Sequence, residues 1–431
     1  PLAAPAGAAQ RASGPARRVR GLRVRRPRTP LCAARRGLEP AFPPGVRIAL
    51  LIVLLIHGLI HGLGVVKAFA LAPVPQLAAP ISRPLGVLWL IAGLLLVAAA
   101  LTPWRWFWLV AGAGAILSQV AIVTAWADAR FGTAANVIAL GAAVWALGAH
   151  GPLSLPAAYA ADAARLLATA APPGAPITEA DLALLPAPIA RYVRAAGVVG
   201  QPVPASVRAR WTGRIRADAG GPWMPLTAVQ VNTLGARADR LFLIAATMNH
   251  LPVDTYHRFV GDHATFRVRA AGVATVVDGR GPEMDRAETV TVLNDLCLLA
   301  PAAVVALSRA PAGSPALAWT PIDDRHARVT YTRGAIAVSA TLEVDDRGAL
   351  VDFVSDDRLR ASRDGATFTP MRWSTPVAAP RGDVTDQTLT RRRCERRAST
   401  SAQIQPMIVQ PRSRLIQKTD QCRTSRTAAT A

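Results

Sequence analysis

The chain has 431 residues, of which 51% are hydrophobic, and its formal net charge at pH 7 is +22. A charge of this size is typical of proteins that bind nucleic acid, but here it is concentrated at the two ends of the sequence. Residues 1–45 carry ten arginines and one acid, and residues 381–431 carry eleven lysines and arginines and four acids, which leaves about +6 for the 335 residues between them. This distribution argues against a specific nucleic-acid function for the body of the chain.

Residues 1–45 are rich in Arg, Pro, Ala and Gly and have no hydrophobic period, so we expect a basic disordered tail. Three interpretations of this tail stay open. It could be an arm that binds anionic lipid head groups, an arm that binds nucleic acid, or the product of a wrongly assigned start.

Four apolar runs follow within residues 46–150, and a helix of about 20 such residues spans a bilayer. The runs comprise residues 48–66, 85–101, 107–127 and 131–149, and none contains a charged residue. Because a charge at mid-bilayer is costly, the pattern predicts four transmembrane helices. The arginines before the first run predict a cytoplasmic N-terminus. The side of the membrane on which residues 177–377 lie stays open, because one misassigned span would reverse it.

His57 and His61 are four residues apart in the first run, so they share one face of the helix. This pair could belong to a metal, haem or proton site. The simpler interpretation, which we favour, is two neutral imidazoles that form hydrogen bonds inside the helical bundle. Ser118 and Gln119 in the third run are expected to join helices in the same way.

Residues 151–176 are rich in Ala and Pro and are expected to form a linker with one short helix at residues 157–169. In residues 177–377 a helix is predicted at 185–196, and a second one at 285–307 is interrupted at Pro301. After residue 204 the hydrophobic period is two, as in half-buried strands. Such strands are predicted at residues 207–215, 224–233, 240–247, 255–260, 264–270, 273–277, 317–322, 326–332, 335–344 and 350–355. The predicted fold is thus a four-helix transmembrane block followed by an α+β domain, a curved antiparallel β-sheet meander with helices.

The best cluster of acids lies around the predicted long helix and consists of Glu283, Asp285, Glu288 and Asp295. These residues could include a general acid and base, but acids near a helix N-terminus also stabilise the helix dipole. The second explanation is sufficient, so no catalytic residue is assigned.

Other site types have weak support in the sequence. His257 and His263 flank a predicted hairpin turn and could approach each other as metal ligands, but no Cys/His spacing typical of a metal site is present. Trp223, Met224 and Tyr256 could line an apolar pocket, although an ordinary core is the simpler explanation, which we favour. Because no dinucleotide-binding, P-loop or nucleophile-elbow motif occurs in the sequence, no cofactor is expected.

Several short motifs resemble an uncharacterised bacterial family of unknown function, the DUF6544 (formerly DUF6920) group. The motifs are Leu185-Pro186-Ala187-Pro188, Gly221-Pro222-Trp223-Met224-Pro225, Gly281-Pro282-Glu283-Met284-Asp285 and Trp373-Ser374-Thr375-Pro376. The apolar block is similar to the N-terminal part of this group at His57-Gly58-Leu59-Ile60-His61 and Asp128-Ala129-Arg130-Phe131-Gly132. The resemblance implies a multi-pass protein of the bacterial inner (cell) membrane, and it implies no activity or catalytic residues.

The sequence departs from this family after Val377, where members continue with further strands. Residues 378–431 are rich in Arg, Thr, Ser and Gln and have no strand period. We therefore expect a second disordered basic tail there, produced by a shifted reading frame near residues 376–380. The sheet would then lack its last strands and have an unpaired edge.

Three functions are compatible with these observations. The preferred one is a membrane-anchored module whose α+β domain binds a lipid or another apolar ligand. The second is a structural or interaction subunit whose helices bind another membrane protein. The third is an enzyme that uses the acids near Asp285. The expected partners are the lipid bilayer and either a lipid-like ligand or a membrane protein.

Overall fold

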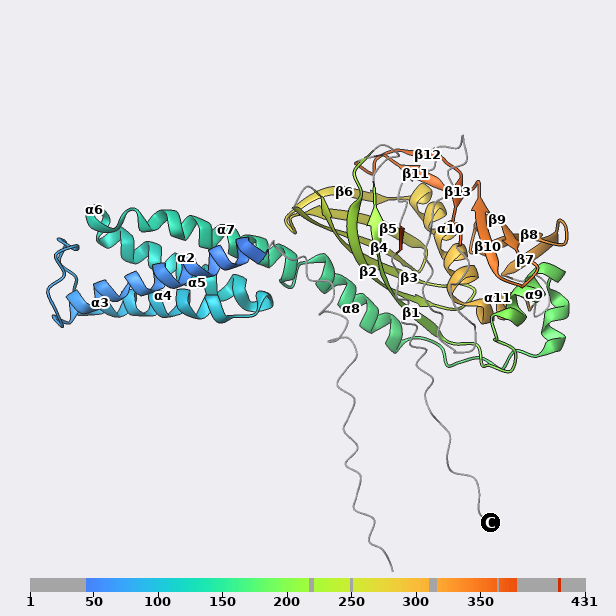
Figure 1. Ribbon diagram of the computed structural model, residues 1–431, viewed down its shortest axis with the longest axis horizontal. Coiled ribbons are helices and arrows are strands. Elements are labelled where there is room, and N and C mark those ends of the chain that lie inside the picture. Colours follow the sequence, from blue (N-terminus) through green and yellow to red (C-terminus); the bar gives the residue numbers. More distant parts are fainter. Residues whose placement is uncertain are drawn as a thin grey trace, which may run out of the picture.

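The computed structural model describes residues 44–216, 221–248, 251–309, 316–362 and 364–377, and the backbone of residues 410–411 (Figure 1). The predicted tails, 1–45 and 378–431, lie almost entirely outside the described residues, and so do the predictions of a wrong start and a shifted frame. The described chain forms an elongated helical block that is followed by a larger part with two sheets (Figure 1).

The helical block contains the apolar helices that the sequence predicts. Its helices are α2 (Pro44–Ile60), α3 (Gly62–Ala68), α4 (Arg83–Leu101), α5 (Trp104–Thr124), α6 (Trp126–Ala129) and α7 (Gly132–His150). Four helical segments, Gly45–Ala68, Arg83–Leu101, Trp104–Thr124 and Gly132–Ala168, are long and apolar enough to cross a membrane. Apolar side chains also cover the outside of the block, where Leu59, Leu94 and Val137 are 71%, 60% and 64% exposed. Such a surface suits lipid better than water.

Small residues allow the helices of the block to approach closely. A Cβ atom added to Gly58 of α2 would lie 2.9 Å from the carbonyl oxygen of Gly93 in α4, and one added to Gly93 would lie 2.7 Å from that of Gly58. Backbone contact of this kind is how helices associate where no hydrophobic effect drives them together.

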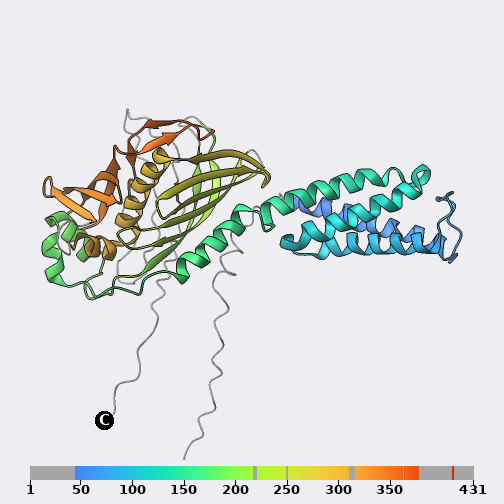
Figure 2. The ribbon, with the colours of Figure 1, turned by 180° about the vertical axis from the view of Figure 1, so that it is seen from behind.

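Helix α8 (Leu155–Ala168) is the short helix that the sequence predicts within its linker segment. Ser154 caps α8 by accepting a hydrogen bond from the backbone N–H of Ala157 at 3.2 Å. The apolar side of α8 then packs on one face of the first sheet, where Tyr159 and Leu166 contact a cluster that includes Leu241 and Tyr256. Seen from behind, α8 leaves the block and runs along this sheet (Figure 2).

The first sheet has seven strands in the order β14-β1-β2-β3-β4-β5-β6, and all neighbours are antiparallel. The strands are β1 (Ser206–Ile215), β2 (Met224–Thr233), β3 (Arg240–Met248), β4 (Leu251–Val260), β5 (His263–Ala270), β6 (Ala274–Arg280) and β14 (Gln410–Pro411). The predicted strands and the Gly261-Asp262-His263 turn are therefore confirmed. We call the face of this sheet that α8 covers the outer face, and we call the opposite face the inner face.

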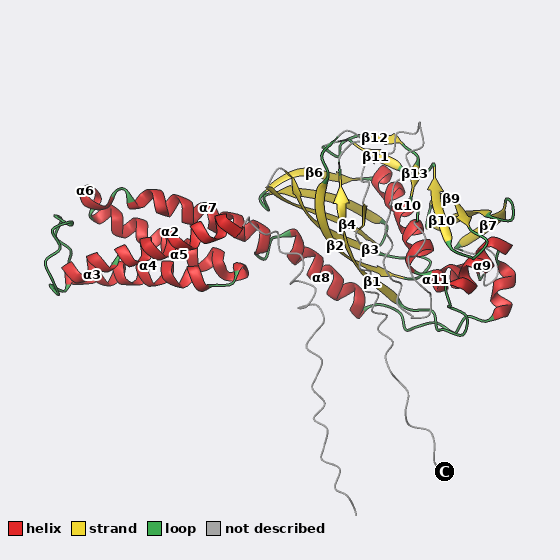
Figure 3. Cartoon of the chain, in the orientation of Figure 1, coloured by secondary structure: helices red, strands yellow, loops and turns green. Residues whose placement is uncertain are grey.

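The predicted meander is divided by helices into two sheets (Figure 3). Helices α10 (Pro282–Leu299) and α11 (Pro301–Ser308) meet at 113°, so the predicted break at Pro301 is confirmed. The second sheet has the order β13-β10-β9-β8-β7, and β11 pairs with β12 as a separate hairpin. Its strands and the hairpin are β7 (Leu317–Pro321), β8 (His326–Arg333), β9 (Ile336–Val344), β10 (Leu350–Ser355), β11 (Leu359–Ala361), β12 (Phe368–Pro370) and β13 (Trp373–Ser374).

The main core lies between α10, α11 and the second sheet. It also includes α9 (Ala187–Ala195) and the short 3₁₀ helix η1 (Glu179–Leu184). Tyr192 of α9 donates a hydrogen bond to the carbonyl oxygen of Cys297 at 2.6 Å. Helix α10 is thereby held with one side toward this core and the other toward the inner face of the first sheet.

Candidate functional site

The inner face of the first sheet changes from apolar to polar along each of its central strands. Alternate residues of a strand share one face. On β2 the inner residues are, in order, Met224, Leu226, Ala228, Gln230 and Asn232, and all but Met224 are buried.

Strand β3 shows the same change from apolar to polar residues, and it is aligned with that of β2. Its inner residues are Met248, Ala246, Ile244, Phe242 and Arg240, counted from the end at which Met224 also lies. Ala228 pairs with Ile244, and Asn232 pairs with Arg240. The two strands thus align an apolar half of the inner face and a polar half.

Two acids of α10 lie over the polar half. Glu288 and Asp295 are seven residues apart, which places them on one side of the helix two turns from each other. Arg240 bridges them, because its Nε atom donates to Oδ2 of Asp295 at 2.7 Å and its Nη1 atom donates to Oε2 of Glu288 at 3.1 Å. The side chains of Arg240 and Glu288 are 5% and 0% exposed.

Amide side chains of β2 also donate hydrogen bonds to Asp295. Its Oδ2 atom also accepts hydrogen bonds from Nε2 of Gln230 at 2.6 Å and from Nδ2 of Asn232 at 3.0 Å. The Oε1 atom of Gln230 accepts in turn from the indole N–H of Trp211 at 2.9 Å. These bonds hold α10 against β1, β2 and β3.

His257 joins the group from β4. Its Nδ1 atom lies 3.0 Å from Oε1 of Glu288, and its ring lies 4.4 Å from the ring of Phe266, centroid to centroid. The guanidinium group of Arg358 lies 3.9 Å from the same carboxylate oxygen. We refer to Arg240, Glu288, Asp295, His257, Gln230, Asn232 and Arg358 together as the buried charge network.

Burial and neighbouring charges set the protonation states in this network. Burial would lower the pKa of Arg240, but the carboxylates of Asp295 and Glu288 outweigh it and raise the pKa. Burial would raise the pKa of Glu288, but its interactions with His257, Arg240 and Arg358 outweigh this and lower the pKa. Burial lowers the pKa of His257 despite the attraction of Glu288, so we assign His257 as neutral at pH 7.

Three polar atoms at this site have no hydrogen-bond partner among the described residues. They are Nε2 of His257, Oδ1 of Asn294 and Nε of Arg358, and His257 and Asn294 are each 7% exposed. Because the carboxylate of Glu288 can only accept, the proton of a neutral His257 is on Nδ1, and Nε2 is an acceptor. A buried acceptor without a partner costs about 1–3 kcal/mol, so a group that donates a hydrogen bond would be stabilised there.

The structure separates the acids that the sequence groups together. Asp295 is in the buried charge network, whereas Glu283 is exposed at the start of α10. Asp285 accepts a hydrogen bond from the backbone N–H of Ala264 at 2.6 Å. Asp285 and Asp295 are ten residues apart, or about 15 Å along the helix axis, so they do not form an acid–base pair. Glu288, which the sequence analysis also considered, is the acid that joins Asp295.

The predicted metal ligands of the sheet are likewise apart. His263 is 88% exposed at the turn and faces Asp285 at 3.9 Å, whereas His257 is buried beside Glu288. No group of three or more His, Cys, Asp or Glu side chains within the described ranges is arranged to hold a metal ion.

The predicted apolar ligand residues lie in different places. Met224 is on the inner face in a cluster with Leu226 and Ile244. Trp223 lies beside it, where the guanidinium group of Arg216 is 4.5 Å from its ring centroid. Tyr256 is on the outer face and donates a hydrogen bond to Asp162 of α8 at 2.7 Å. Tyr256 therefore does not belong to a site with the other two.

His57 and His61 are both buried inside the helical block. The Nε2 atom of His57 lies 3.0 Å from Oδ1 of Asn136 and 3.1 Å from Oγ of Ser118, so this histidine connects α2 with α7 and α5. The His61 ring lies 4.9 Å from that of His57 and 5.0 Å from that of Trp89. The bonds of His57 are those of a residue that holds helices together.

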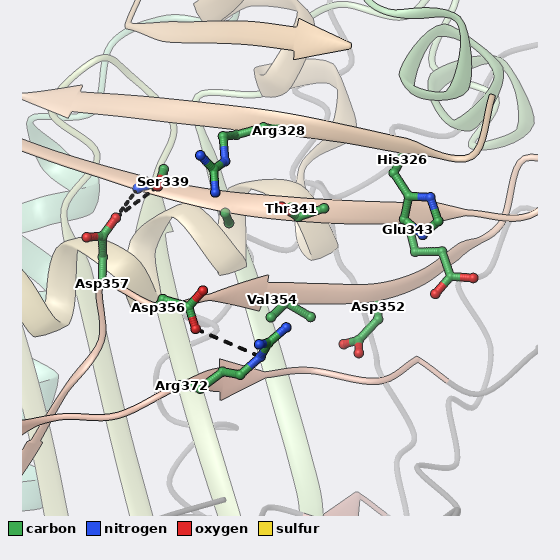
Figure 4. Close-up of a pocket in the computed structure, with 11 residues that line it drawn as sticks. His326, Arg328, Ser339, Thr341, Glu343, Asp352, Val354, Asp356, Asp357 and Arg372 are labelled. Carbon is green, nitrogen blue, oxygen red and sulfur yellow. Dashed lines mark hydrogen bonds and ion pairs between the residues drawn. The ribbon is translucent and has the colours of Figure 1, made fainter. Parts of the chain in front are cut away.

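An open hollow of about 290 Å³ lies on the second sheet (Figure 4). Two of the acids that line it already have partners on the protein. Asp357 accepts hydrogen bonds from the backbone N–H and the hydroxyl of Ser339 at 2.6 and 3.0 Å, and Asp352 accepts one from Ser374 at 2.9 Å. The hollow is therefore a weaker candidate than the inner face of the first sheet.

Sequence reasoning missed Gln230, Asn232, Arg240 and Arg358. A signal for the first three was present, because they are polar residues on the inward phase of strands whose other inward residues are apolar. The sequence does not indicate that these three residues converge on Asp295, because that depends on how α10 crosses the sheet.

Comparison with known proteins agrees with the resemblance in the sequence for the part with two sheets. Neither the curated proteins nor the solved structures gave a match. The model of one family, described as a family of unknown function (DUF6544), matches residues 175–383. This stretch begins before η1 and contains the strands and helices that build the inner face. Over residues 175–383, the chain is therefore similar to the DUF6544 family.

Proposed function

We propose that this protein is a membrane-anchored module that binds a lipid-like molecule along the inner face of its first sheet. The observation that carries the proposal is the change along β2 and β3 from apolar side chains to a buried charge network. An amphipathic molecule has the same division, with an apolar chain at one end and a polar head group at the other.

The apolar half of the site would hold the chain. Leu226, Ala228, Ile244 and Ala246 are at most 8% exposed, and Trp211 and Phe242 pack beside them. Burial of hydrocarbon against such side chains contributes roughly 0.8 kcal/mol per methylene group.

The polar half favours a neutral head group that donates hydrogen bonds. Arg240 and Arg358 balance Glu288 and Asp295, and His257 is neutral, so the network carries no net charge that would attract an ion. The unpaired Nε2 atom of His257 accepts a hydrogen bond. A hydroxyl group fits this requirement better than a carboxylate, which can only accept.

Photolabelling of the full-length protein in liposomes tests the proposal. The probe is a monoacylglycerol with a diazirine in its acyl chain, and the comparison probe is the corresponding fatty acid. We expect the monoacylglycerol to label peptides from β2 and β3 and the fatty acid to label them less. Labelling of the helical block alone, at the level given by any bilayer lipid, would refute the proposal.

A pair of substitutions on one strand provides the matched control. Ala228→Trp fills space on the inner face, whereas Thr227→Trp places the same side chain on the outer face one residue away. We expect Ala228→Trp to abolish labelling of β2 and β3 and Thr227→Trp to preserve it. Equal labelling of the two variants would show that the probe does not occupy the inner face.

A further inference from the structure

The end of the first sheet near the helical block lies level with the last turn of a candidate membrane-spanning helix. The turn between β5 and β6 contacts α7, because a Cβ atom added to Gly272 would lie 2.7 Å from the backbone nitrogen of Ala149. One added to Gly148 would lie 2.4 Å from the carbonyl oxygen of Gly272. Close by, Nη1 of Arg269 donates to the carbonyl oxygen of Leu153 at 2.8 Å.

Aromatic side chains mark this end of the block as the level of the lipid head groups. The Trp104 ring lies 5.2 Å from that of Trp145 and 6.2 Å from that of His150, the last residue of α7. The guanidinium group of Arg47 lies 5.7 Å from the Trp104 centroid. Tryptophan and arginine concentrate at the boundary between hydrocarbon and water.

Two adjacent hairpins of the sheet present apolar side chains at this level. Val273, between β5 and β6, and Val276, near the start of β6, are each 50% exposed. Met248 and Leu251, which pair at the tip of β3 and β4, are 41% and 51% exposed. The two hairpin ends are level with each other, since Val253, two residues after Leu251, pairs with Ala270, the last residue of β5. Scattered exposed apolar residues are common, but these four are gathered at the same end of adjacent strands.

We propose that Met248, Leu251, Val273 and Val276 insert into the head-group layer of the bilayer that holds the four apolar helices. These side chains would anchor the sheet against the membrane surface, as apolar side chains of peripheral proteins do when they enter the boundary layer by about 5–10 Å. The apolar half of the inner face begins at the same end of the sheet, at Met224 and Met248. If the inner face takes the ligand proposed above, that ligand enters from the bilayer.

Fluorescence quenching in liposomes tests this insertion. Cys32, Cys394 and Cys422 are replaced by Ser, and Cys297 is kept because it is fully buried. An environment-sensitive dye is then attached to single cysteines in the variants Leu251→Cys, Val273→Cys and Ile322→Cys. Ile322 is the control, since it is 55% exposed and follows β7 at the opposite end of the molecule (Figure 1).

We expect phospholipids with a spin label near the head of the acyl chain to quench the dye several-fold more at positions 251 and 273 than at 322. Equal quenching at all three positions would overturn the proposal. Quenching at 273 alone would also overturn it, because it would report only the contact with α7. The result is independent of photolabelling: quenching without labelling of β2 and β3 would retain the insertion and reject the ligand.

Discussion

Removal of the Arg240 side chain should destabilise the inner face more than any other single change in the buried charge network. Arg240→Met keeps most of the volume of the side chain but leaves the carboxylates of Glu288 and Asp295 buried without their shared cation. Glu288 is 0% exposed, so water cannot replace the lost partner. Breaking a buried ion pair from one side costs about 3–5 kcal/mol.

Hydrogen exchange of backbone amides in β3 and α10 measures this loss in the full-length protein, because it reports the free energy of local opening. A change of 3–5 kcal/mol corresponds to exchange roughly a hundredfold to several thousandfold faster. The matched control is Arg325→Met. Arg325 also forms an ion pair, with Glu343 at 3.0 Å, but its side chain is 48% exposed. Such an exposed pair contributes about 0–1 kcal/mol.

The pH dependence separates a charge effect from a packing effect. Without Arg240, the pKa of Glu288 in the folded state should rise above its value in the unfolded chain. A group with a raised pKa destabilises the fold increasingly as the pH rises. The difference between wild type and Arg240→Met should therefore be larger at pH 8 than at pH 5. A difference below 1 kcal/mol, or one that does not change with pH, would refute the assignment of this arginine as the cation of two buried carboxylates.

Two further predictions concern the region near α7. Burial raises the pKa of Asp254, which is 3% exposed, to about 7 against the opposing charge of Arg269. The wild type should therefore lose stability relative to Asp254→Asn as the pH rises from about 4 to 7, by at most roughly 4 kcal/mol, and melting curves of both proteins across this range check it. Gly272→Ala should loosen the contact with α7, measured as faster hydrogen exchange at residues 148–153. Gly261→Ala should not, because both glycines have positive φ, +70° and +64°, but only a Cβ atom at Gly272 would meet a neighbour within 4 Å.

The features that could be predicted from the sequence depend on local patterns. The four apolar runs appear as helices, and β2 has the predicted bounds, because its alternation and its flanking turn residues agree. Pro301 breaks the long helix since a proline cannot donate the hydrogen bond that would continue it. Each of these outcomes is decided by residues within about one element of each other.

The division of the strands into two sheets could not be predicted in this way. Antiparallel pairing with the next strand is equally favourable on either side of α10, so periodicity alone implies a single meander. A long-range contact joins the two sheets. Arg333 of β8 is 2% exposed and donates to the carbonyl oxygen of Ala238, before β3, at 2.8 Å. Its guanidinium group also lies 4.1 Å from the ring centroid of Phe259 in β4. Nothing in the local sequence of either segment indicates this contact.

The buried charge network is difficult to explain by stability alone. Apolar side chains of similar volume usually stabilise a core as well as a buried ion network does, or better. A network that served only to attach α10 would also be expected to pair every buried polar atom. Here Nε2 of His257 is unpaired among the described residues, and the network lies at the end of an apolar face that continues toward the helical block. An unpaired acceptor at the end of an apolar surface is what a site for a lipid-like molecule requires. Under the proposed function, the energetic cost of the network would be the cost of distinguishing the head group of the bound molecule from its chain.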